Sequence, residues 1–220
     1  MSDPDRYGQA MRQGEFRRRV CERLTSAPPP SAPRSDFHLN PDLHPGGERI
    51  LKPAAVLVPI IDYPEEPAVL LTRRTAHLKA HAGQIAFPGG RVEEHDEDAI
   101  ATALRETEEE TGITREWIEP AAVLDIYETS TGFAVTPVLG FIEPGFPLSP
   151  DPGEVSEVFE VPLSFVMNPA NHVHHSGWKH GRRRQWYAMP YGEYYIWGAT
   201  AGMLVSLSHR IGDLCSEPFC

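Results

Sequence analysis

The stretch GGRVEEHDEDAIATALRETEEETGI, residues 89–113, carries the most informative pattern in the chain. Its second half has helical spacing from about Asp98 to Thr111, and Gly112 stands where a left-handed C-cap is favoured. At 100° per residue, three carboxylates share an arc of about 100° on this helix. They belong to Glu106, Glu109 and Glu110. We expect this acidic face to stand apart from an apolar face that packs on a sheet.

Three carboxylates on one helix face favour a bound cation. Like charges four residues apart destabilise a helix by a few tenths of a kcal/mol, and acids near its C-terminal end oppose the helix dipole. Oxygen ligands of this kind suit Mg2+ or Mn2+. Arg105 lies beside the face and is placed to orient a carboxylate through a bidentate contact. From these glutamates alone, a solvated acidic face is an equal alternative.

The loop before the helix completes a known pattern. The sequence FPGG, residues 87–90, predicts a rigid turn whose glycines allow a close approach to a ligand or to the helix. Loop and helix together resemble the Nudix hydrolase box, G-x5-E-x7-R-E-U-x-E-E-x-G-U, in which U is aliphatic. The second half of the box matches at Arg105, at the three glutamates and at Gly112–Ile113, and it departs at Thr107. The resemblance implies a metal-dependent hydrolase of nucleotide pyrophosphate bonds.

The first half of the box contains one extra residue. Counting forward from Gly90 puts Asp96 in the first acidic position, whereas counting back from Arg105 puts Glu97 there. We prefer Glu97 as a supporting metal ligand, because residue spacing is more regular along a helix than in a loop. An acid outside the box, Glu154, is a weaker candidate for a role at the metal or the water.

The upstream sequence LLTRRTAHLKAHAGQIAFPGG, residues 70–90, resembles the extension that marks coenzyme A pyrophosphatases within the Nudix group. Thr75 and Lys79 replace the more usual Ser and Arg. The resemblance implies hydrolysis of coenzyme A or its derivatives to 3′,5′-ADP and 4′-phosphopantetheine. The candidate substrate-binding residues are Arg74, Lys79, His81, Gly89 and Gly90. In the alternative interpretation, Arg74 and Lys79 only balance the acidic helix and His81 is a hydrogen-bonding group.

The resemblance also implies the fold, an α/β (α+β) class α/β/α sandwich with a mixed β-sheet between helices. Apolar runs predict strands from about residue 54 onward, and Met203, Leu204, Leu207 and Ile211 have the spacing of a late helix. We expect a hydrolase domain over residues 51–215. Residues 1–50 are expected to form a peripheral, largely solvated helix and Pro-rich arm. The segment HVHHSGWKHGRRR, residues 172–184, is expected to be a solvated hairpin, and contact with a phosphate or an adenine is the alternative.

Composition narrows the class of protein. The formal net charge of -11 over 220 residues makes nucleic acid an unlikely partner, since backbone binding relies on Lys and Arg. No apolar run approaches the ~20 residues of a membrane span, and no signal peptide is recognisable, so we expect a cytoplasmic protein. Its three cysteines, Cys21, Cys215 and Cys220, are interpreted as reduced thiols. The sequence does not decide the oligomeric state, and a homodimer is one possible assembly.

Two other functions stay open on the sequence alone. A Nudix enzyme acting on ADP-ribose or a dinucleotide would keep the chemistry and change the pocket, and the upstream motif disfavours it. A non-catalytic nucleotide-binding module would keep the fold and lose hydrolysis, and the intact box acids disfavour that.

Overall fold

The computed structural model describes residues 15–26, 34–77, 81–179 and 181–215. Within these ranges, nine strands form one mixed sheet whose main path runs β1-β7-β8-β2-β3-β4, while β5 pairs with β2, β6 with β8 and β9 with β3. Its strands are β1 (Arg34–Ser35), β2 (Lys52–Ile61), β3 (Ala68–Arg74), β4 (Ile85–Ala86), β5 (Gly89–Arg91), β6 (Ile118–Val123), β7 (Tyr127–Glu128), β8 (Phe133–Ile142) and β9 (Val155–Pro162). A smaller antiparallel sheet consists of β10 (Val173–Lys179), β11 (Arg182–Tyr191) and β12 (Tyr194–Trp197).

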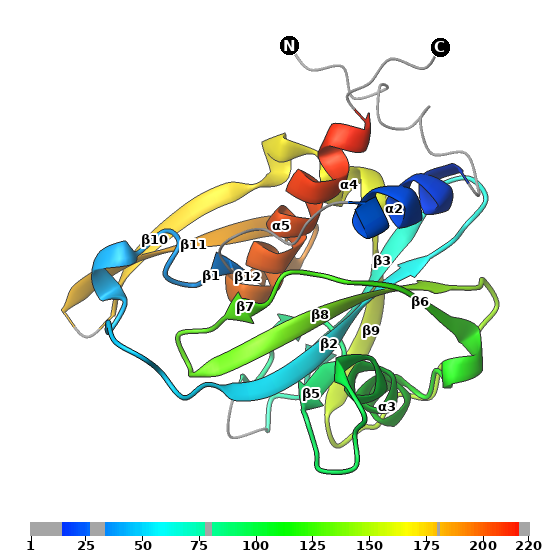
Figure 1. Cartoon of the computed structure of the whole chain (residues 1–220), viewed down its shortest axis with the longest axis horizontal. Coiled ribbons are helices and arrows are strands. Elements are labelled where there is room, and N and C mark those ends of the chain that lie inside the picture. The colour runs from blue at the N-terminus through cyan, green and yellow to red at the C-terminus, as the bar shows by residue number, and fades with distance from the viewer. Residues whose placement is uncertain (1–14, 27–33, 78–80, 180, 216–220) are drawn as a thin grey trace.

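Helices cover both faces of the large sheet, so the predicted sandwich with a mixed sheet between helices is confirmed. In Figure 1, α3 lies below β2 and β8, and α2 and α5 lie above them. The α-helices are α2 (Glu15–Ser26), α3 (Ala99–Thr111), α4 (Leu163–Met167) and α5 (Gly198–Cys215), and three short 3-10 turns are η1 (Pro41–Leu43), η2 (Arg115–Trp117) and η3 (Pro169–Asn171).

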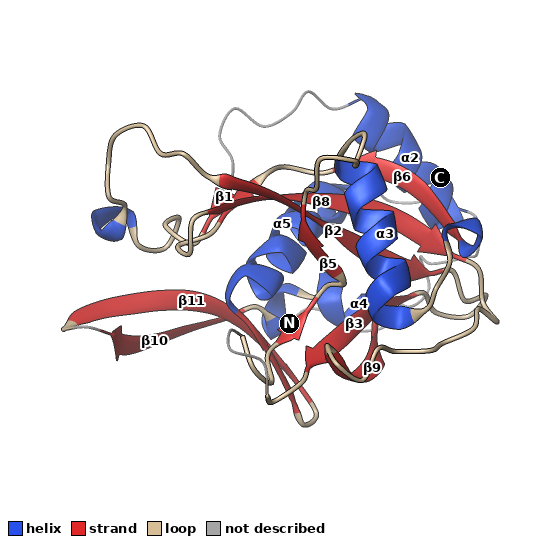
Figure 2. Ribbon diagram, turned by 90° about the horizontal axis from the view of Figure 1, so that it is seen from below, coloured by secondary structure: helices blue, strands red, loops and turns tan. Residues whose placement is uncertain are grey.

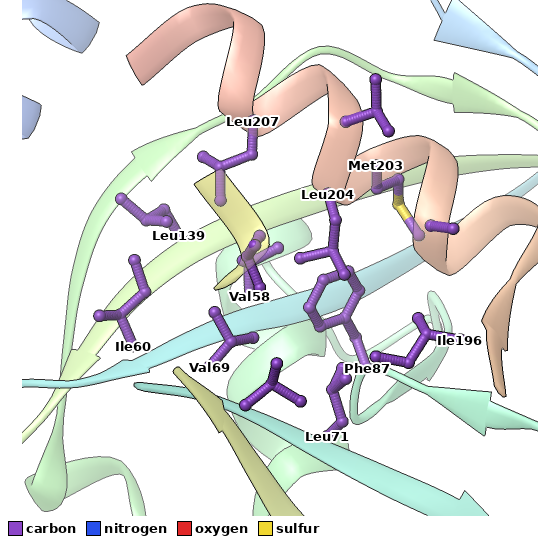
Figure 3. Packing of buried hydrophobic residues seen from close by; sticks show 14 of the residues in the cluster. Val58, Ile60, Val69, Leu71, Phe87, Leu139, Ile196, Met203, Leu204 and Leu207 are labelled. Atoms are coloured by element: carbon purple, nitrogen blue, oxygen red, sulfur yellow. The ribbon is translucent and has the colours of Figure 1, made fainter. Parts of the chain in front are cut away.

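The parallel pair β2–β8 forms the centre of the sheet. Its register runs without interruption from Lys52 opposite Phe133 to Ile61 opposite Ile142. A parallel pair covered on both faces needs nearly continuous apolar strands, and seven of the ten β2 residues are buried. One buried cluster packs between the sheet and α5, as Figure 3 shows for Val58, Leu139, Leu204 and their neighbours. A second cluster lies under α3 and includes Leu57 and Leu104. All four apolar residues of the predicted late helix are buried in α5.

Helix α3 begins and ends at the predicted signals. The Asp98 carboxylate accepts a hydrogen bond from the Ala101 amide (2.8 Å) as the N-cap. Gly112 has a φ of 75°, and its amide donates to the Glu108 carbonyl (2.9 Å). Thr107, where the box pattern has an aliphatic residue, is fully buried and donates its hydroxyl to the Ala103 carbonyl (2.6 Å). Because the hydroxyl is satisfied inside the helix, threonine fits this apolar position.

The described part of the N-terminal segment contacts the domain more closely than a fully solvated surface would. Val20 of α2 is fully buried in the cluster under α5. Arg17 forms ion pairs with Asp62 (3.8 Å) and Glu119, and β1 extends the large sheet by pairing in parallel with β7. The expected hairpin at residues 172–184 is confirmed as β10–β11, which projects from the body of the molecule (Figure 1). In the described ranges, no helix has the length and apolar character needed to cross a bilayer.

Replacing Gly112 should destabilise the protein for two reasons. Its left-handed backbone costs an L-residue about 1–2 kcal/mol, and a Cβ here would also press on the main chain of Ser149. Gly46 is the matched control, because its φ is 72° and nothing lies within 4 Å of its would-be Cβ. We expect Gly112→Ala to lower the free energy of unfolding by at least ~1 kcal/mol more than Gly46→Ala, measured by urea denaturation. Equal losses would mean that the Ser149 contact is unimportant.

Candidate active site

Arg105 and Asp96 form the central contact of the candidate site. The Arg105 guanidinium donates through Nε to Asp96 Oδ1 (3.0 Å) and through a terminal nitrogen to Oδ2 (2.9 Å). The Asp96 carboxylate also accepts from the Glu93 amide and the Thr102 hydroxyl, both at 2.9 Å. These bonds, that from Arg105 above all, hold the pKa of Asp96 well below its usual range. The pair ties the loop before α3 to the helix itself.

The structure distinguishes the two rival loop acids. The Asp96 side chain is only 3% exposed and faces Arg105. Glu97 is exposed, and within the described residues no hydrogen bond or ion pair of its side chain is seen. The contact with Arg105 is therefore made by Asp96, whereas the role of Glu97 as a supporting metal ligand stays a prediction. Counting back from Arg105 did not lead to Asp96, because the residues between Asp96 and the N-cap Asp98 precede the helix, where spacing is not helical.

Arg105 also positions two of the box glutamates. One terminal nitrogen lies 3.0 Å from Glu106 Oε1 and 3.0 Å from Glu109 Oε2. Glu106 points toward β5, where a Cβ on Gly90 would collide with its carboxylate. Glycine at position 90 thus allows the strand backbone to approach the acid closely. Burial raises the pKa of Glu106, and the neighbouring Arg105 opposes this rise.

Glu110 is a buried acid of the cluster, with a side chain 3% exposed. Arg74 from the end of β3 reaches it at 3.2 Å, and the Gly89 amide donates to it at 3.4 Å. The pKa of Glu110 is raised to about 7: burial raises it most, Arg74 opposes the rise, and Glu106 and Glu154 add to it. Arg74 also lies 3.9 Å from Glu154, so the weaker candidate from outside the box belongs to the same cluster.

The cluster has more negative than positive charge. Among the described residues in it, five carboxylates share the guanidinium groups of Arg74 and Arg105. In the described ranges, no group of three or more His, Cys, Asp or Glu is arranged to hold a metal ion. The donor chemistry nevertheless fits a hard divalent cation, since the oxygens are crowded, partly desolvated and incompletely neutralised.

A cavity of about 320 Å³ opens beside this cluster. Arg74 and Gly89, which contact Glu110, form one end of its lining, together with Phe87. His81 also lines it and has a φ of 58°, with its Nδ1 2.6 Å from Gln84 Oε1. Three of the five predicted substrate-binding residues, Arg74, His81 and Gly89, thus line this cavity, and Gly90 lies against Glu106. Figure 2 shows β3, β5 and α3, the elements nearest the box acids, from below. Lys79, the fifth, lies outside the described residues.

Comparisons with known proteins all identify Nudix proteins as similar to this chain. A family model described as the NUDIX domain matches residues 51–180. Nudix hydrolase NudL of Escherichia coli (strain K12), whose own name calls it uncharacterized, is 43% identical over 159 residues, or 72% of this chain and 82% of that protein. NudL of Shigella boydii serotype 4 (strain Sb227) is 42% identical over the same shares. The solved structure of a MutT/nudix family protein from Enterococcus faecalis has a TM-score of 0.49 and 19% identity, covering 78% of this chain and 66% of that one.

Removing the Asp96 carboxylate should loosen the loop from α3. Asp96→Asn leaves Arg105 without its bidentate partner, and hydrogen bonds to charged groups contribute ~1.5–3 kcal/mol each. We expect the free energy of unfolding to fall by about 2 kcal/mol, whereas Glu97→Gln, at an exposed position, should change it by less than ~0.5 kcal/mol. Urea denaturation of both variants checks this. Similar losses for the two acids would contradict the assignment of Asp96 as the partner of Arg105.

Proposed function

This chain belongs to the Nudix hydrolase family, and we propose that its substrate is coenzyme A or a coenzyme A derivative. The proposed reaction cleaves the pyrophosphate bond to give 3′,5′-ADP and 4′-phosphopantetheine. The observation that supports this assignment most strongly is the contact of Arg74, from the coenzyme A-type upstream motif, with Glu110 of the box. It puts the motif that distinguishes this subgroup directly beside the acids that the family uses.

We propose that Glu106, Glu109 and Glu110 hold one or more Mg2+ or Mn2+ ions. When bound, such an ion neutralises diphosphate charge and lowers the pKa of a coordinated water. Arg105 orients Glu106 and Glu109, and its own orientation is set by Asp96. A box glutamate with a free oxygen would take the proton from the attacking water. Glu154 is placed to assist, since it lies against Arg74.

We propose that Arg74 binds the diphosphate and that Lys79 binds the separate 3′-phosphate of coenzyme A. Arg74 reaches into the cavity beside the acids, where Gly89 exposes its backbone and His81 lines the wall. In the absence of substrate, Arg74 is paired with Glu110, which is the alternative interpretation made from the sequence. The two roles are compatible, because a guanidinium has five donors and can bridge a carboxylate and a phosphate.

Glu110→Gln should remove most turnover. Losing one ligand charge weakens metal binding and its charge stabilisation, so we expect kcat to fall at least ~100-fold. Mn2+ affinity, measured by calorimetric titration, should fall in parallel, which gives a readout independent of turnover. Glu108→Gln is the matched control, because Glu108 is an exposed glutamate of the same helix. Turnover within a few-fold of wild type at saturating metal would refute the role of Glu110.

The proposed placement of Arg74 and Lys79 predicts which phosphate group of the substrate each side chain binds. Lys79→Ala should weaken hydrolysis of coenzyme A roughly ten- to a hundredfold while sparing dephospho-coenzyme A, because only the former has the 3′-phosphate. Arg74→Ala should weaken both. Arg73→Ala is the control, since Arg73 on the same strand pairs instead with Glu157 (3.1 Å). The substrate assignment fails if wild-type protein cleaves ADP-ribose or a dinucleotide far more efficiently than coenzyme A, or if it binds nucleotides without cleaving them.

A further inference from the structure

A second cavity, of about 430 Å³, lies between the N-terminal arm and the β10–β11 hairpin. Three of its lining residues are arginines. Arg49 comes from the N-terminal arm, and Arg182 and Arg184 come from the projecting hairpin. One acid, Asp36, lines the cavity with them, and Phe37, Leu43 and Pro45 supply apolar wall. A cationic cavity in a chain with a net charge of -11 points to an anionic ligand.

The three arginines differ in how far they are neutralised. Arg184 donates to Asp36 Oδ2 (2.9 Å) and to the Ser130 hydroxyl (2.7 Å). Arg49 pairs with Glu128 and lies over the Phe37 ring, 5.5 Å from its centroid. Arg182 is exposed, and no ion pair or side-chain hydrogen bond to it occurs within the described part of the chain. Arg182 therefore brings an unbalanced positive charge to a cavity whose other arginines are held in place.

This arginine cavity adjoins the cavity beside the active-site acids. The two have four lining residues in common, namely Asp36, Ser130, Thr131 and Arg184. The opposite end of the shared path is formed by Arg74 and Gly89, which contact Glu110. Between these ends the wall is largely apolar, with Val56, Val135 and Met203 among its residues. A long ligand that lies across the four shared residues would reach both the box acids and the arginines.

The sheet gives the length of that path. From β5, which carries Gly89, to β1, which Asp36 follows directly, the strands run β5, β2, β8, β7 and β1. Four steps of about 4.8 Å each separate the ends by on the order of 20 Å. The 3′-phosphate of coenzyme A sits on the same ribose as the diphosphate, only a few bonds away. It is too close to the cleaved bond to reach the arginine cavity.

The pantetheine arm runs the other way and is long enough. Its backbone matches about four extended amino-acid residues, or roughly 14 Å, and an acyl group on its sulfur extends it further. We propose that the arginine cavity binds a carboxylate at the end of such an acyl group, so that coenzyme A esters of dicarboxylic acids are preferred substrates. This proposal rests on the proposed function and assigns the far end of the same substrate. Guanidinium groups bind carboxylates by paired hydrogen bonds, which fits the arginines found there.

Two esters of equal carbon count test the proposal: glutaryl-coenzyme A and pentanoyl-coenzyme A, which differ in the terminal carboxylate. Wild-type protein should have a kcat/KM about tenfold or more higher for the glutaryl ester, chiefly through KM. Arg182→Gln should reduce this ratio to near one. Arg183→Gln is the matched control, because Arg183 is adjacent on β11, contacts Ser176 (3.2 Å) and does not line the cavity; it should preserve the ratio.

Each outcome supports or overturns the inference. Equal kcat/KM for the two esters in wild-type protein overturns it, as does a ratio that survives Arg182→Gln, and neither result affects coenzyme A as the substrate class. Failure to cleave any coenzyme A species, with ADP-ribose cleaved instead, refutes the proposed function itself. If diadenosine tetraphosphate is the better substrate and depends on Arg182, the cavity binds phosphate of a second nucleotide, and the dicarboxylic ester is refuted. Thermal unfolding of Arg182→Gln close to wild type confirms that the variant is folded.

Discussion

The bidentate contact between Arg105 and Asp96 determines how the acidic face of α3 is presented. An isolated charge at a position only 3% exposed would be costly, and the paired hydrogen bonds to Arg105 offset that cost. The same guanidinium holds Glu106 and Glu109. Loop, helix and two acids therefore form one unit, in which Arg105 contacts all three carboxylates.

The sheet brings the substrate-binding side to this unit. β2 pairs with β5 along one edge and with β8 along the other, so Gly89 and Gly90 lie against α3 while the opposite face of β2 packs under α5. Arg74, at the end of β3, extends from the sheet to Glu110. The cavity that begins there has β2 and α5 residues in its wall, which is why a core that buries Val58 and Leu204 also shapes the site.

Short sequence patterns predicted the features that depend on neighbouring residues, such as the bounds of α3 and its acidic face. Asp98 and Gly112 bound α3 as expected, and the spacing of the glutamates placed them on one face, because a helix converts sequence separation into angle. In the irregular loop no such conversion exists, so counting could not decide between Asp96 and Glu97. The packing of the N-terminal arm was not predictable for a related reason: its composition says nothing of strand pairing, and Arg34 pairs with Tyr127, more than ninety residues away along the chain. The arginine run at 182–184 was visible, but Asp36 and Arg49 beside it come from that arm.

Charge is arranged along the molecule in a way that composition hides. Near α3, five carboxylates share two arginines, and that excess of negative charge fits the divalent cation that we propose to accompany a diphosphate. Across the sheet, three arginines meet one lining acid, so an anion can be bound there without metal. An acidic protein can thus bind a polyanion if one end of the polyanion is bound through a metal ion and the other end through arginines. Coulomb repulsion between the box acids and a substrate anion on the order of 20 Å away is weak at physiological ionic strength, since the Debye length is about 8 Å. The two ends can then bind their groups almost independently, and the length of the substrate couples them.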